Sequence, residues 1–470
     1  MIEFDNVSFR YDSEQQAGSI DELSLRIKKG ECVLLCGPSG CGKTTAIRMM
    51  NGLIPHFYEG EMRGQVKVSG KNVVEEELYS IAREVGTVFQ NPRSQFFNVD
   101  TTSELPFGCE NMGLPEKEIK ERIQSVIEQA GISKLMDRNI FKLSGGEKQK
   151  IACASVMTST PDIIVLDEPS ANLDYDAITD LQKMLGIWKK EGKTIVIAEH
   201  RLAYCLDYVD RIIIMDKGRI VQDVSRNQFQ TYRDEELHSM GLRSTKNIDA
   251  RTVSKSPHTG EYMTIRNLFF GYEKSSPVLD FAKMDIPLNE VVAIVGSNGV
   301  GKTTFLRCLC GMEKRCKAVL EYRGKLYKNK QRMKLMYLVM QDVNHQLFTE
   351  SVLEEVMISM EEENETEAIK ILEVLDLSDL KDRHPVSLSG GQKQRVAVAS
   401  AIASKRNIVL FDEPTSGLDY RHMMQVGRLL NKLKEAGKTV LVVTHDAELV
   451  ENCCTSVISL ERGRANGTDF

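Results

Sequence analysis

Two eight-residue stretches decide the fold of this chain, GPSGCGKT at 37–44 and GSNGVGKT at 296–303. Each stretch follows a short apolar run, CVLLC or VVAIV, and opens a segment with helical character. In the pattern GxxxxGK[ST], glycines let backbone N–H groups turn inward, and the N-terminus of the following helix adds positive potential around a polyphosphate. A Gly-rich turn can match by accident, but two matches in the same strand–loop–helix context make accident untenable. The chain therefore predicts two phosphate-binding loops.

Each residue type in these loops has its own expected task. Lys43 and Lys302 should reach the β- and γ-phosphates, whereas Thr44 and Thr303 should hold Mg²⁺. The residues expected to surround the bound polyphosphate are Gly37, Pro38, Ser39, Gly40, Cys41, Gly42, Lys43, Thr44 and Thr45 in the first loop and Gly296, Ser297, Asn298, Gly299, Val300, Gly301, Lys302, Thr303 and Thr304 in the second.

Two further apolar runs, IIVL and IVLF, end in the carboxylate pairs Asp167-Glu168 and Asp412-Glu413. A carboxylate pair at the end of a buried strand is costly unless it serves an ion or a reaction. We expect Asp167 and Asp412 to hold Mg²⁺, and Glu168 and Glu413 to polarise an attacking water. Alone, such a pair often marks only a strand that ends at the surface. Beside a phosphate loop it indicates hydrolysis.

The landmarks of the first half recur in the same order in the second half. The spacing is 259 residues at the loop lysine, 251 at a glutamine and 245 at three later positions, and the pairs are Lys43 and Lys302, Gln90 and Gln341, Ser144 and Ser389, Asp167 and Asp412, and His200 and His445. A repeat of this length is a duplicated domain, not a solenoid unit. We expect domains at 1–240 and 263–470, joined by a polar linker at 241–262. The segment 228–242 reads as a short closing helix.

The amino-acid composition is typical of a globular protein and bears on which classes of partner the chain binds. Of 470 residues, 41% are hydrophobic and 27% charged, with a net charge of −6. The chain has no basic tract, so its charge gives no reason to expect nucleic acid as a partner. No apolar run approaches the length that spans a bilayer, and the N-terminus has no secretory signal. The closest cysteines, Cys308, Cys310 and Cys316, fit no zinc or iron–sulfur spacing, so we expect reduced structural thiols.

LSGGE at 143–147 and LSGGQ at 388–392 complete the pattern. With the phosphate loops and the carboxylate pairs, they make each half resemble the nucleotide-binding domain of ABC (ATP-binding cassette) proteins. The resemblance implies an α/β fold of two tandem P-loop NTPase domains, each with a mostly parallel core sheet, an antiparallel β subdomain and a helical subdomain. It also implies that the chain is an ATPase that uses ATP and Mg²⁺.

The same resemblance implies roles for residues outside the loops. Tyr11 and Tyr272 look like the aromatic residue that stacks on adenine. Gln90 and Gln341 look like the Q-loop glutamine, which senses Mg²⁺ and touches the transport partner. The D-loops correspond to Ser170-Ala171-Asn172-Leu173-Asp174 and Ser416-Gly417-Leu418-Asp419, and the switch histidines that contact the γ-phosphate correspond to His200 and His445. A lone histidine after a strand is otherwise a satisfied surface side chain.

In the family, the signature turn of one half closes over ATP held by the other half. The signature residues are Ser144, Gly145, Gly146 and Glu147 in the first half and Ser389, Gly390, Gly391 and Gln392 in the second. A serine and two glycine N–H groups at a helix N-terminus form an anion site, which makes this pairing reasonable. Neither half has lost its lysine, glutamate or histidine, so we expect two hydrolytic sites.

The segments after the glutamines narrow the choice of ABC machine. VFQNPRSQFFNVDTTSELPFGCENMGLP and VMQDVNHQLFTESVLEEV resemble the ATPases of energy-coupling factor (ECF) importers, which take up vitamins or transition-metal ions. The resemblance implies two partners, a transmembrane coupling protein and a substrate-binding membrane protein, and a place at the cytoplasmic face of the cell membrane. The second copy lacks FG-x-EN and is shorter before its signature.

Two other tandem ABC ATPases remain as alternatives. One is the ATPase of a sugar-type importer, in which one site is often degenerate. The other is a soluble ribosome-associated ATPase, which usually carries a long basic linker or an iron–sulfur cysteine set. The short linker of mixed charge and the scattered cysteines argue against the ribosomal alternative.

Overall fold

The computed structural model describes most of the 470-residue chain, namely residues 1–12, 18–171, 173–256, 258–272, 277–388, 390–461 and 464–466. Two residues named from the sequence, Asn172 of a D-loop and the signature Ser389, lie outside the described residues. Internal contacts divide the chain into two compact units, Met1–Asn247 with Gly417–Arg421 and Ile248–Ser416 with His422–Phe470. The predicted domain limits at 240 and 263 stay a prediction.

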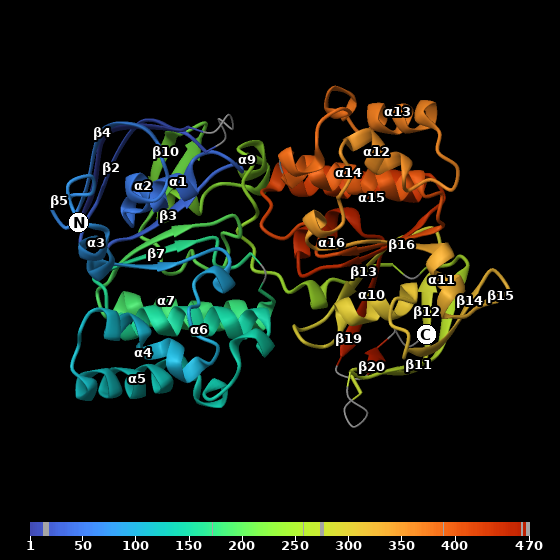
Figure 1. The fold of residues 1–470 in the computed structure, drawn as a ribbon, viewed down its shortest axis with the longest axis horizontal. Coiled ribbons are helices and arrows are strands. Elements are labelled where there is room, and N and C mark those ends of the chain that lie inside the picture. Colours follow the sequence, from blue (N-terminus) through green and yellow to red (C-terminus); the bar gives the residue numbers. More distant parts are fainter. Residues whose placement is uncertain are drawn as a thin grey trace. The chain divides into compact units, whose positions relative to one another are not determined.

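The first unit is centred on a six-stranded sheet with the strand order β10-β9-β3-β8-β7-β6 (Figure 1). Its strands are β3 (Cys32–Cys36), β6 (Val85–Val88), β7 (Ile163–Asp167), β8 (Thr194–Ala198), β9 (Arg211–Asp216) and β10 (Arg219–Ser225). All neighbours pair in parallel except β10, which runs antiparallel to β9. The strands β3, β7 and β8 are buried along their whole length, which explains their unbroken apolar sequences. The predicted mostly parallel core sheet is confirmed.

This topology gathers the predicted site residues of the first unit. In a parallel sheet, the loops that follow the strands lie along one edge. The phosphate loop follows β3, Glu168 follows β7, and His200 comes two residues after the end of β8. The register pairs Asp167 with Ala198, so the ends of β7 and β8 lie side by side.

An antiparallel sheet of order β2-β1-β4-β5 forms the predicted β subdomain. Its strands are β1 (Ile2–Tyr11), β2 (Ile20–Ile27), β4 (Gly60–Val68) and β5 (Lys71–Asn72). Buried side chains on β1 alternate as Ile2 and Phe4, then as Val7 and Phe9. The alternation shifts by one residue because the pairing with β2 changes register between Phe4 and Val7.

The helices of the first unit surround both sheets. They are α1 (Lys43–Met50), α2 (Leu53–His56), α3 (Leu78–Glu84), α4 (Thr101–Asn111), α5 (Glu116–Ala130), α6 (Gly145–Ser159), α7 (Tyr175–Lys190), α8 (Arg226–Phe229) and α9 (Asp234–Ser239). The helices α4, α5 and α6 pack on one another and form the predicted helical subdomain. The predicted closing helix consists of two short helices, α8 and α9, rather than one.

The second unit repeats this architecture. Its core sheet has the order β16-β17-β18-β13-β19-β20, and its antiparallel sheet has the order β12-β11-β14-β15. The strands are β11 (Tyr262–Phe270), β12 (Leu279–Pro287), β13 (Val291–Val295), β14 (Lys317–Tyr322), β15 (Lys325–Tyr327), β16 (Met336–Val339), β17 (Ile408–Asp412), β18 (Thr439–Val443), β19 (Ser456–Glu461) and β20 (Arg464–Asn466). The helices are α10 (Lys302–Cys310), α11 (Asn329–Leu335), α12 (Val352–Met357), α13 (Glu365–Val374), α14 (Gly390–Ala403), α15 (Tyr420–Glu435) and α16 (Ala447–Cys453).

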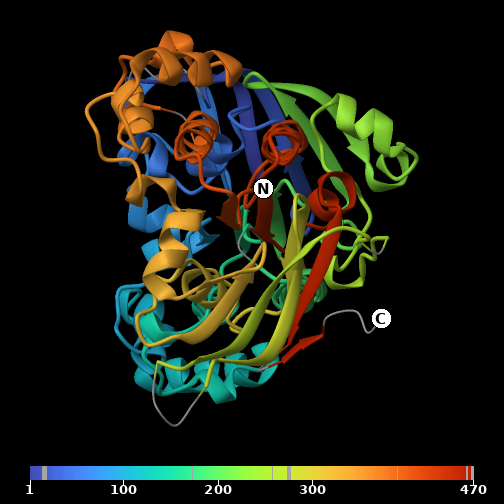
Figure 2. The same cartoon turned by 90° about the vertical axis from the view of Figure 1, so that its right-hand side faces the viewer.

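The second unit differs most in its helical subdomain. Figure 2 shows α12 and α13, in orange, at the end of this unit opposite the yellow strands of its antiparallel sheet. Helix α12 has 6 residues where α4 has 11, and α13 has 10 where α5 has 15, so both helices in the shorter segment before the second signature are reduced. Across the described ranges, no helix combines the length and the apolar character needed to cross a bilayer.

Candidate functional site

The first phosphate loop bends where only glycine fits. Gly37 and Gly42 have φ angles of 150° and 103°. A Cβ on Gly37 would lie 2.1 Å from the Met215 carbonyl oxygen, and a Cβ on Gly42 would lie 2.8 Å from Ile20 Cδ1. In the second unit, a Cβ on Gly296 would lie 2.4 Å from the Leu460 carbonyl oxygen. Each loop therefore lies directly against neighbouring strands, and its backbone is free to face the opposite side.

The loop lysines are buried inside the loops that carry them. Lys43 Nζ donates to the carbonyl oxygens of Gly37 at 3.0 Å and Pro38 at 3.3 Å. Lys302 Nζ donates to the carbonyl oxygens of Gly296 at 2.9 Å and Ser297 at 3.1 Å. Both ammonium groups thus sit at the centre of a curled loop, where a phosphate oxygen could replace a carbonyl partner.

The hydroxyl of Thr44 donates to Asp167 Oδ1 at 3.0 Å, so loop and carboxylate meet directly. Burial, and next the charge of Glu168, raise the pKa of Asp167 to about 6. Burial also raises the pKa of Asp412, although the hydroxyl of Thr303 acts against it. Within the described residues, Asp412 Oδ1 is buried without a hydrogen-bond partner. A carboxylate and a hydroxyl in this arrangement are the oxygen donors that Mg²⁺ prefers, and a cation would offset the cost of their burial.

Glu168 contacts two predicted site residues of the first unit, and one of these also contacts Lys43. Its Oε2 accepts from Gln90 Nε2 at 2.8 Å, and its Oε1 lies 3.3 Å from His200 Nε2. His200 Nε2 also lies 3.3 Å from Lys43 Nζ. Burial acts to raise the pKa of Glu168, but its contacts with His200 and the charge of Lys43 lower it overall. The carboxylate is therefore kept ionised, as an acceptor for a water proton must be.

The backbone at both glutamates is left-handed. Glu168 has φ 43° and Glu413 has φ 49°, a conformation that is uncommon for residues other than glycine. Hydrogen bonds hold it, because Glu168 N–H donates to the Ala198 carbonyl oxygen and Glu413 N–H to that of Val443. The strain turns each carboxylate out of its strand and toward the histidine of the neighbouring strand.

The second unit arranges its glutamate and histidine differently. His445 Nε2 lies 3.3 Å from Glu413 Oε1 and 3.0 Å from Asn298 Oδ1 of the phosphate loop. In addition, the backbone N–H of His445 donates to Glu413 Oε2 at 3.3 Å. In the first unit the corresponding N–H of His200 donates to another residue, Glu199. Gln341 is exposed on the loop after β16.

The aromatic residues at the ends of β1 and β11 make the same contact in both units. Tyr11 is hydrogen-bonded to Thr45 Oγ1 at 3.0 Å, and Tyr272 to Thr304 Oγ1 at 3.1 Å. Each ring also packs edge-on against the phenylalanine two residues before it, with centroid distances of 4.8 Å and 5.0 Å. Tyr272 lines a cavity of ≈ 280 Å³ together with Lys314 and other residues. Both rings are thus fixed beside the start of the helix that follows the phosphate loop.

The signature segments open long helices. Ser144 caps α6 by accepting from Glu147 N–H, and Glu147 Oε2 accepts from Ser144 N–H at 2.8 Å. Gly145 and Gly146 form the first turn of α6, and Gly390 and Gly391 that of α14. One carboxylate oxygen of Glu147 thus caps its own helix, and the other lies 3.7 Å from Arg138 Nη1, contacts that the sequence did not predict.

Comparison with known proteins decides the family. A family model described as ABC transporter matches residues 20–171 and 279–416. The chain belongs to the ABC transporter family. It is 44% identical to a candidate ABC transporter ATP-binding protein of Treponema denticola, over 99% of this chain and 96% of that protein. It is 32% identical to YkoD of Bacillus subtilis, a candidate HMP/thiamine import ATP-binding protein, over 98% of this chain and 90% of that protein.

Solved structures of ABC proteins share the fold. A chain in the structure of ribosome-bound archaeal Pelota and ABCE1 aligns with a TM-score of 0.66 and 22% identity, over 98% of this chain and 78% of that chain. This likeness bears on the fold alone. The predicted pair of tandem ABC domains is confirmed, and so is the predicted ATPase class: the chain is an ATP-binding subunit of an ABC transporter. ABC transporter ATPases work with transmembrane subunits of the transporter.

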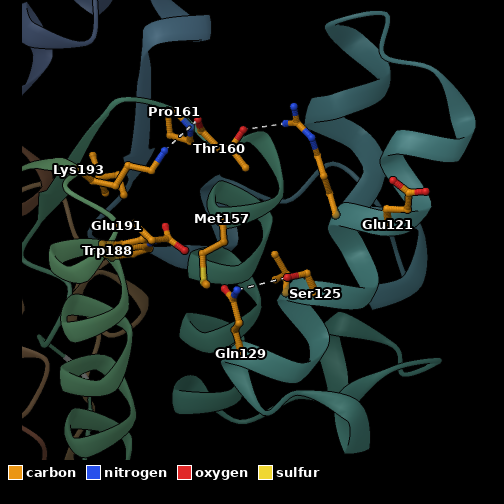
Figure 3. Close-up of a pocket in the computed structure, with 12 residues that line it drawn as sticks. Glu121, Ser125, Gln129, Met157, Thr160, Pro161, Trp188, Glu191 and Lys193 are labelled. Carbon is orange, nitrogen blue, oxygen red and sulfur yellow. Dashed lines mark hydrogen bonds between the residues drawn. The ribbon is translucent and has the colours of Figure 1, made fainter.

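A cavity of ≈ 330 Å³ lies among α5, the end of α6 and α7 (Figure 3). Arg122 donates to the carbonyl oxygens of Thr158 and Ser159, and Lys193 to that of Thr160. These carbonyls belong to the C-terminal end of α6, which a helix leaves without internal partners and which favours cations. Arg122 and Lys193, which line the cavity, therefore cap the C-terminal end of α6, the helix that begins with the signature segment.

The eleven cysteines are buried free thiols, as expected for Cys308, Cys310 and Cys316. Within the described part of the chain, no group of His, Cys, Asp and Glu side chains could hold a metal ion by itself. One buried residue that sequence reasoning missed is Glu199, which precedes His200. Its only signal in the sequence is a charge directly after the apolar run TIVIA, a position easily taken for the exposed end of a strand.

Proposed function

We propose that this chain powers an ECF-type ABC importer of a vitamin or a transition-metal ion. The observation that carries the proposal is the 32% identity to YkoD along nearly the whole chain, because that protein's name includes HMP/thiamine import. The segments after Gln90 and Gln341, which resemble those of ECF ATPases, support the same conclusion. Cellular ATP is in the cytoplasm, so the chain would bind its membrane partners at the cytoplasmic face of the membrane.

The proposed chemistry follows from the geometry of each unit. Glu168 would accept a proton from the attacking water, since it is ionised, only partly exposed and turned out of its strand. His200 would orient this carboxylate and contact the γ-phosphate, while Lys43 neutralises phosphate charge. Glu413, His445 and Lys302 would have these roles in the second unit. The pairing of each signature turn with the phosphate loop of the other half stays a prediction.

Mg²⁺ fits the oxygen groups that end β7 and β17. We assign it to Thr44, Asp167 and Gln90 in the first unit and to Thr303, Asp412 and Gln341 in the second. When bound, the ion would neutralise charge on the β- and γ-phosphates. In the first unit, the hydrogen bond between Thr44 and Asp167 would break, and both side chains would contact the ion instead.

An exposed aromatic patch near Gln90 suits a membrane subunit. Phe97 is 76% exposed and stacks on Phe107 with a centroid distance of 4.7 Å. Val99 and Phe141 are also exposed, and the carbonyl oxygen of Val99 accepts from Ile140 N–H, beside Phe141. Grouped exposed apolar side chains mark interaction sites more often than scattered ones do. A short amphipathic helix of a transmembrane coupling protein would cover this patch.

The second unit has a corresponding patch of different chemistry. Phe348 is 72% exposed, and Ile358 and Val386 occupy the positions of Phe107 and Phe141. Phe348 thus keeps the ring of Phe97, but aliphatic side chains replace its stacking partner and Phe141. The two halves would therefore bind different helical segments, which favours a coupling protein whose two docking helices are not identical.

Co-purification tests the proposed function. The tagged chain, extracted from its own cells in mild detergent, should bring down two membrane proteins, and its Phe97→Asp variant should lose them. Tyr79 is the control, since it is equally exposed on α3 but outside the patch, and Tyr79→Asp should retain both. Recovery of ribosomes in place of membrane proteins would support the soluble tandem ATPase instead. A single pair of identical membrane subunits with a soluble binding protein would support the sugar-type importer.

A further inference from the structure

The loops that carry Glu168 and His200 are tied together by one buried carboxylate in the first unit. Glu199 lies between β8 and His200, and its side chain is buried. Its Oε1 accepts from the backbone N–H groups of His200 at 2.7 Å and Arg201 at 3.1 Å. These bonds fix the start of the loop that presents the histidine to Glu168.

The other carboxylate oxygen reaches the loop after β7. Glu199 Oε2 accepts from Ser170 Oγ at 2.8 Å, from Ser170 N–H at 3.3 Å and from the Tyr204 hydroxyl at 3.0 Å. Burial, and next the charge of Glu199, raise the pKa of Tyr204, so the phenol stays a donor. Ser170 is two residues after Glu168 along the chain. The carboxylate of Glu199 therefore accepts hydrogen bonds from five donors. Through them it joins the segment after Glu168 to the segment that carries His200.

The second unit provides an internal comparison, because it lacks the carboxylate and the phenol of this connection and keeps only a hydroxyl at the position of Ser170. Thr444 stands where the first unit has Glu199, and its hydroxyl accepts a local bond from Asp446 N–H at 3.0 Å. Leu449 replaces Tyr204, and Thr415 replaces Ser170. Among the described residues, the buried Thr415 Oγ1 has no hydrogen-bond partner.

The backbone confirms that these positions are equivalent. Glu199 N–H donates to the carbonyl oxygen of Leu35, and Thr444 N–H donates to that of Ile294, 259 residues further along. The two strands thus end alike, and only the side chains differ. Without the buried carboxylate, the N–H of His445 turns to Glu413 itself, as described above.

We propose that Glu199 is a positioning residue that holds the histidine and glutamate loops of the first unit in register for hydrolysis, and that the second unit hydrolyses without this restraint. The inference rests on the proposed roles of Glu168 and His200. It goes beyond them because it makes the two ATP sites unequal. A buried hub of charge-assisted hydrogen bonds is stiff, and small displacements of catalytic groups cost large factors in rate.

The central test replaces Glu199 by the residue of the second unit. Glu199→Thr should lower kcat for ATP by about 10- to 100-fold, the cost of misplacing a catalytic group by about an ångström, while KM changes less than about twofold. Glu199→Gln should retain kcat within about threefold. Its amide oxygen still accepts from the backbone N–H groups of His200 and Arg201, and its NH₂ can donate to the hydroxyls of Ser170 and Tyr204. Only the longest of the five bonds, from Ser170 N–H, loses its acceptor.

Turnover is measured in the intact chain and in a chain that carries Glu413→Gln. With both chains, a lower rate of ATP hydrolysis at the first site is detected whether the two sites act together or independently. Fluorescence of Trp188, in the same unit, checks folding. If Glu199→Thr does not fold, Glu199→Asp replaces it, with an expected fall in kcat of at least about threefold at unchanged KM. A kcat within twofold of the parent in both chains would overturn the inference.

Glu168→Gln in the same two chains separates this inference from the proposed function. If the chain with both glutamates replaced turns over ATP like the parent, the proposed catalytic roles fail. If that chain is inactive and Glu199→Thr behaves like the parent, only the positioning role fails. If Glu199→Gln is as slow as Glu199→Thr, the carboxylate acts by its charge rather than by joining the loops, and the inference is wrong.

Discussion

Gly37→Ala is the substitution whose effect the structure fixes most closely. The added Cβ would lie 2.1 Å from the carbonyl oxygen of Met215 and 2.8 Å from Cys41 Sγ. Met215 is in β9, which pairs with β3, so its carbonyl cannot move without disturbing the core sheet. The φ of 150° adds a backbone cost of about 1–3 kcal/mol, and overpacking typically costs about 1–3 kcal/mol more. We therefore expect a loss of about 2–6 kcal/mol.

Gly131→Ala is the matched control. Gly131 ends α5 with φ 61°, and a Cβ there would meet no atom within 4 Å. In this variant only the left-handed backbone conformation is unfavourable, and it should lower the free energy of unfolding by about 1–2 kcal/mol. The difference between the two variants isolates the contact with Met215.

The chain offers a suitable probe, since its single tryptophan, Trp188, is only 1% exposed in the first unit. Urea unfolding followed by its fluorescence reports the first unit alone. Gly37→Ala should unfold at clearly lower urea than Gly131→Ala, and calorimetric titration should show one ATP bound per chain instead of two. Equal unfolding midpoints and two bound ATP molecules in Gly37→Ala would refute the reasoning.

Three other predictions concern chemistry. Lys43→Ala removes the ammonium at the centre of the first loop and should weaken ATP binding there by about 1.5–3 kcal/mol, as expected for charge-assisted hydrogen bonds, whereas equal affinity by calorimetry would argue against its role. Glu168→Gln with Glu413→Gln should keep ATP binding but cut phosphate release by about 10²–10⁴-fold, the usual effect of losing a general base, and unchanged release would contradict both assignments. Replacement of Cys308, Cys310 and Cys316 by serine should leave turnover intact, since these thiols lie in the buried core of the second unit; stoichiometric metal in the purified parent, measured by mass spectrometry, would speak against this.

The sequence predicted those features that depend on short, regular patterns. An unbroken apolar run before each phosphate loop indicated a strand buried on both faces, and β3 and β13 are such strands. The recurrence of the loop lysine, the carboxylates and the histidine in the same order predicted a duplicated domain, and the two units share one architecture. The second copy is shorter before its signature, and its helix α12 is shorter than α4.

Other features depend on contacts that no local pattern encodes. Glu199 read as a charge at the end of a strand, and only the fold brings Ser170 and Tyr204 to it. The contact of Glu147 with nucleotide stays a prediction, and its carboxylate also caps α6, which no local pattern had suggested. In both cases the carboxylate accepts hydrogen bonds from backbone N–H groups, and Glu199 also accepts from the hydroxyls of Ser170 and Tyr204.

The divergence at Glu199 and Thr444 is possible because the two halves belong to one polypeptide. Separately encoded copies could assemble as like pairs, and each copy would then have to function in every combination. Translation as a single molecule fixes the ratio at one to one, so a division of labour can accumulate without producing inactive mixtures. If Glu199 has the positioning role proposed above, a cell that makes this protein obtains one strongly restrained site and one loosely restrained site in equal number.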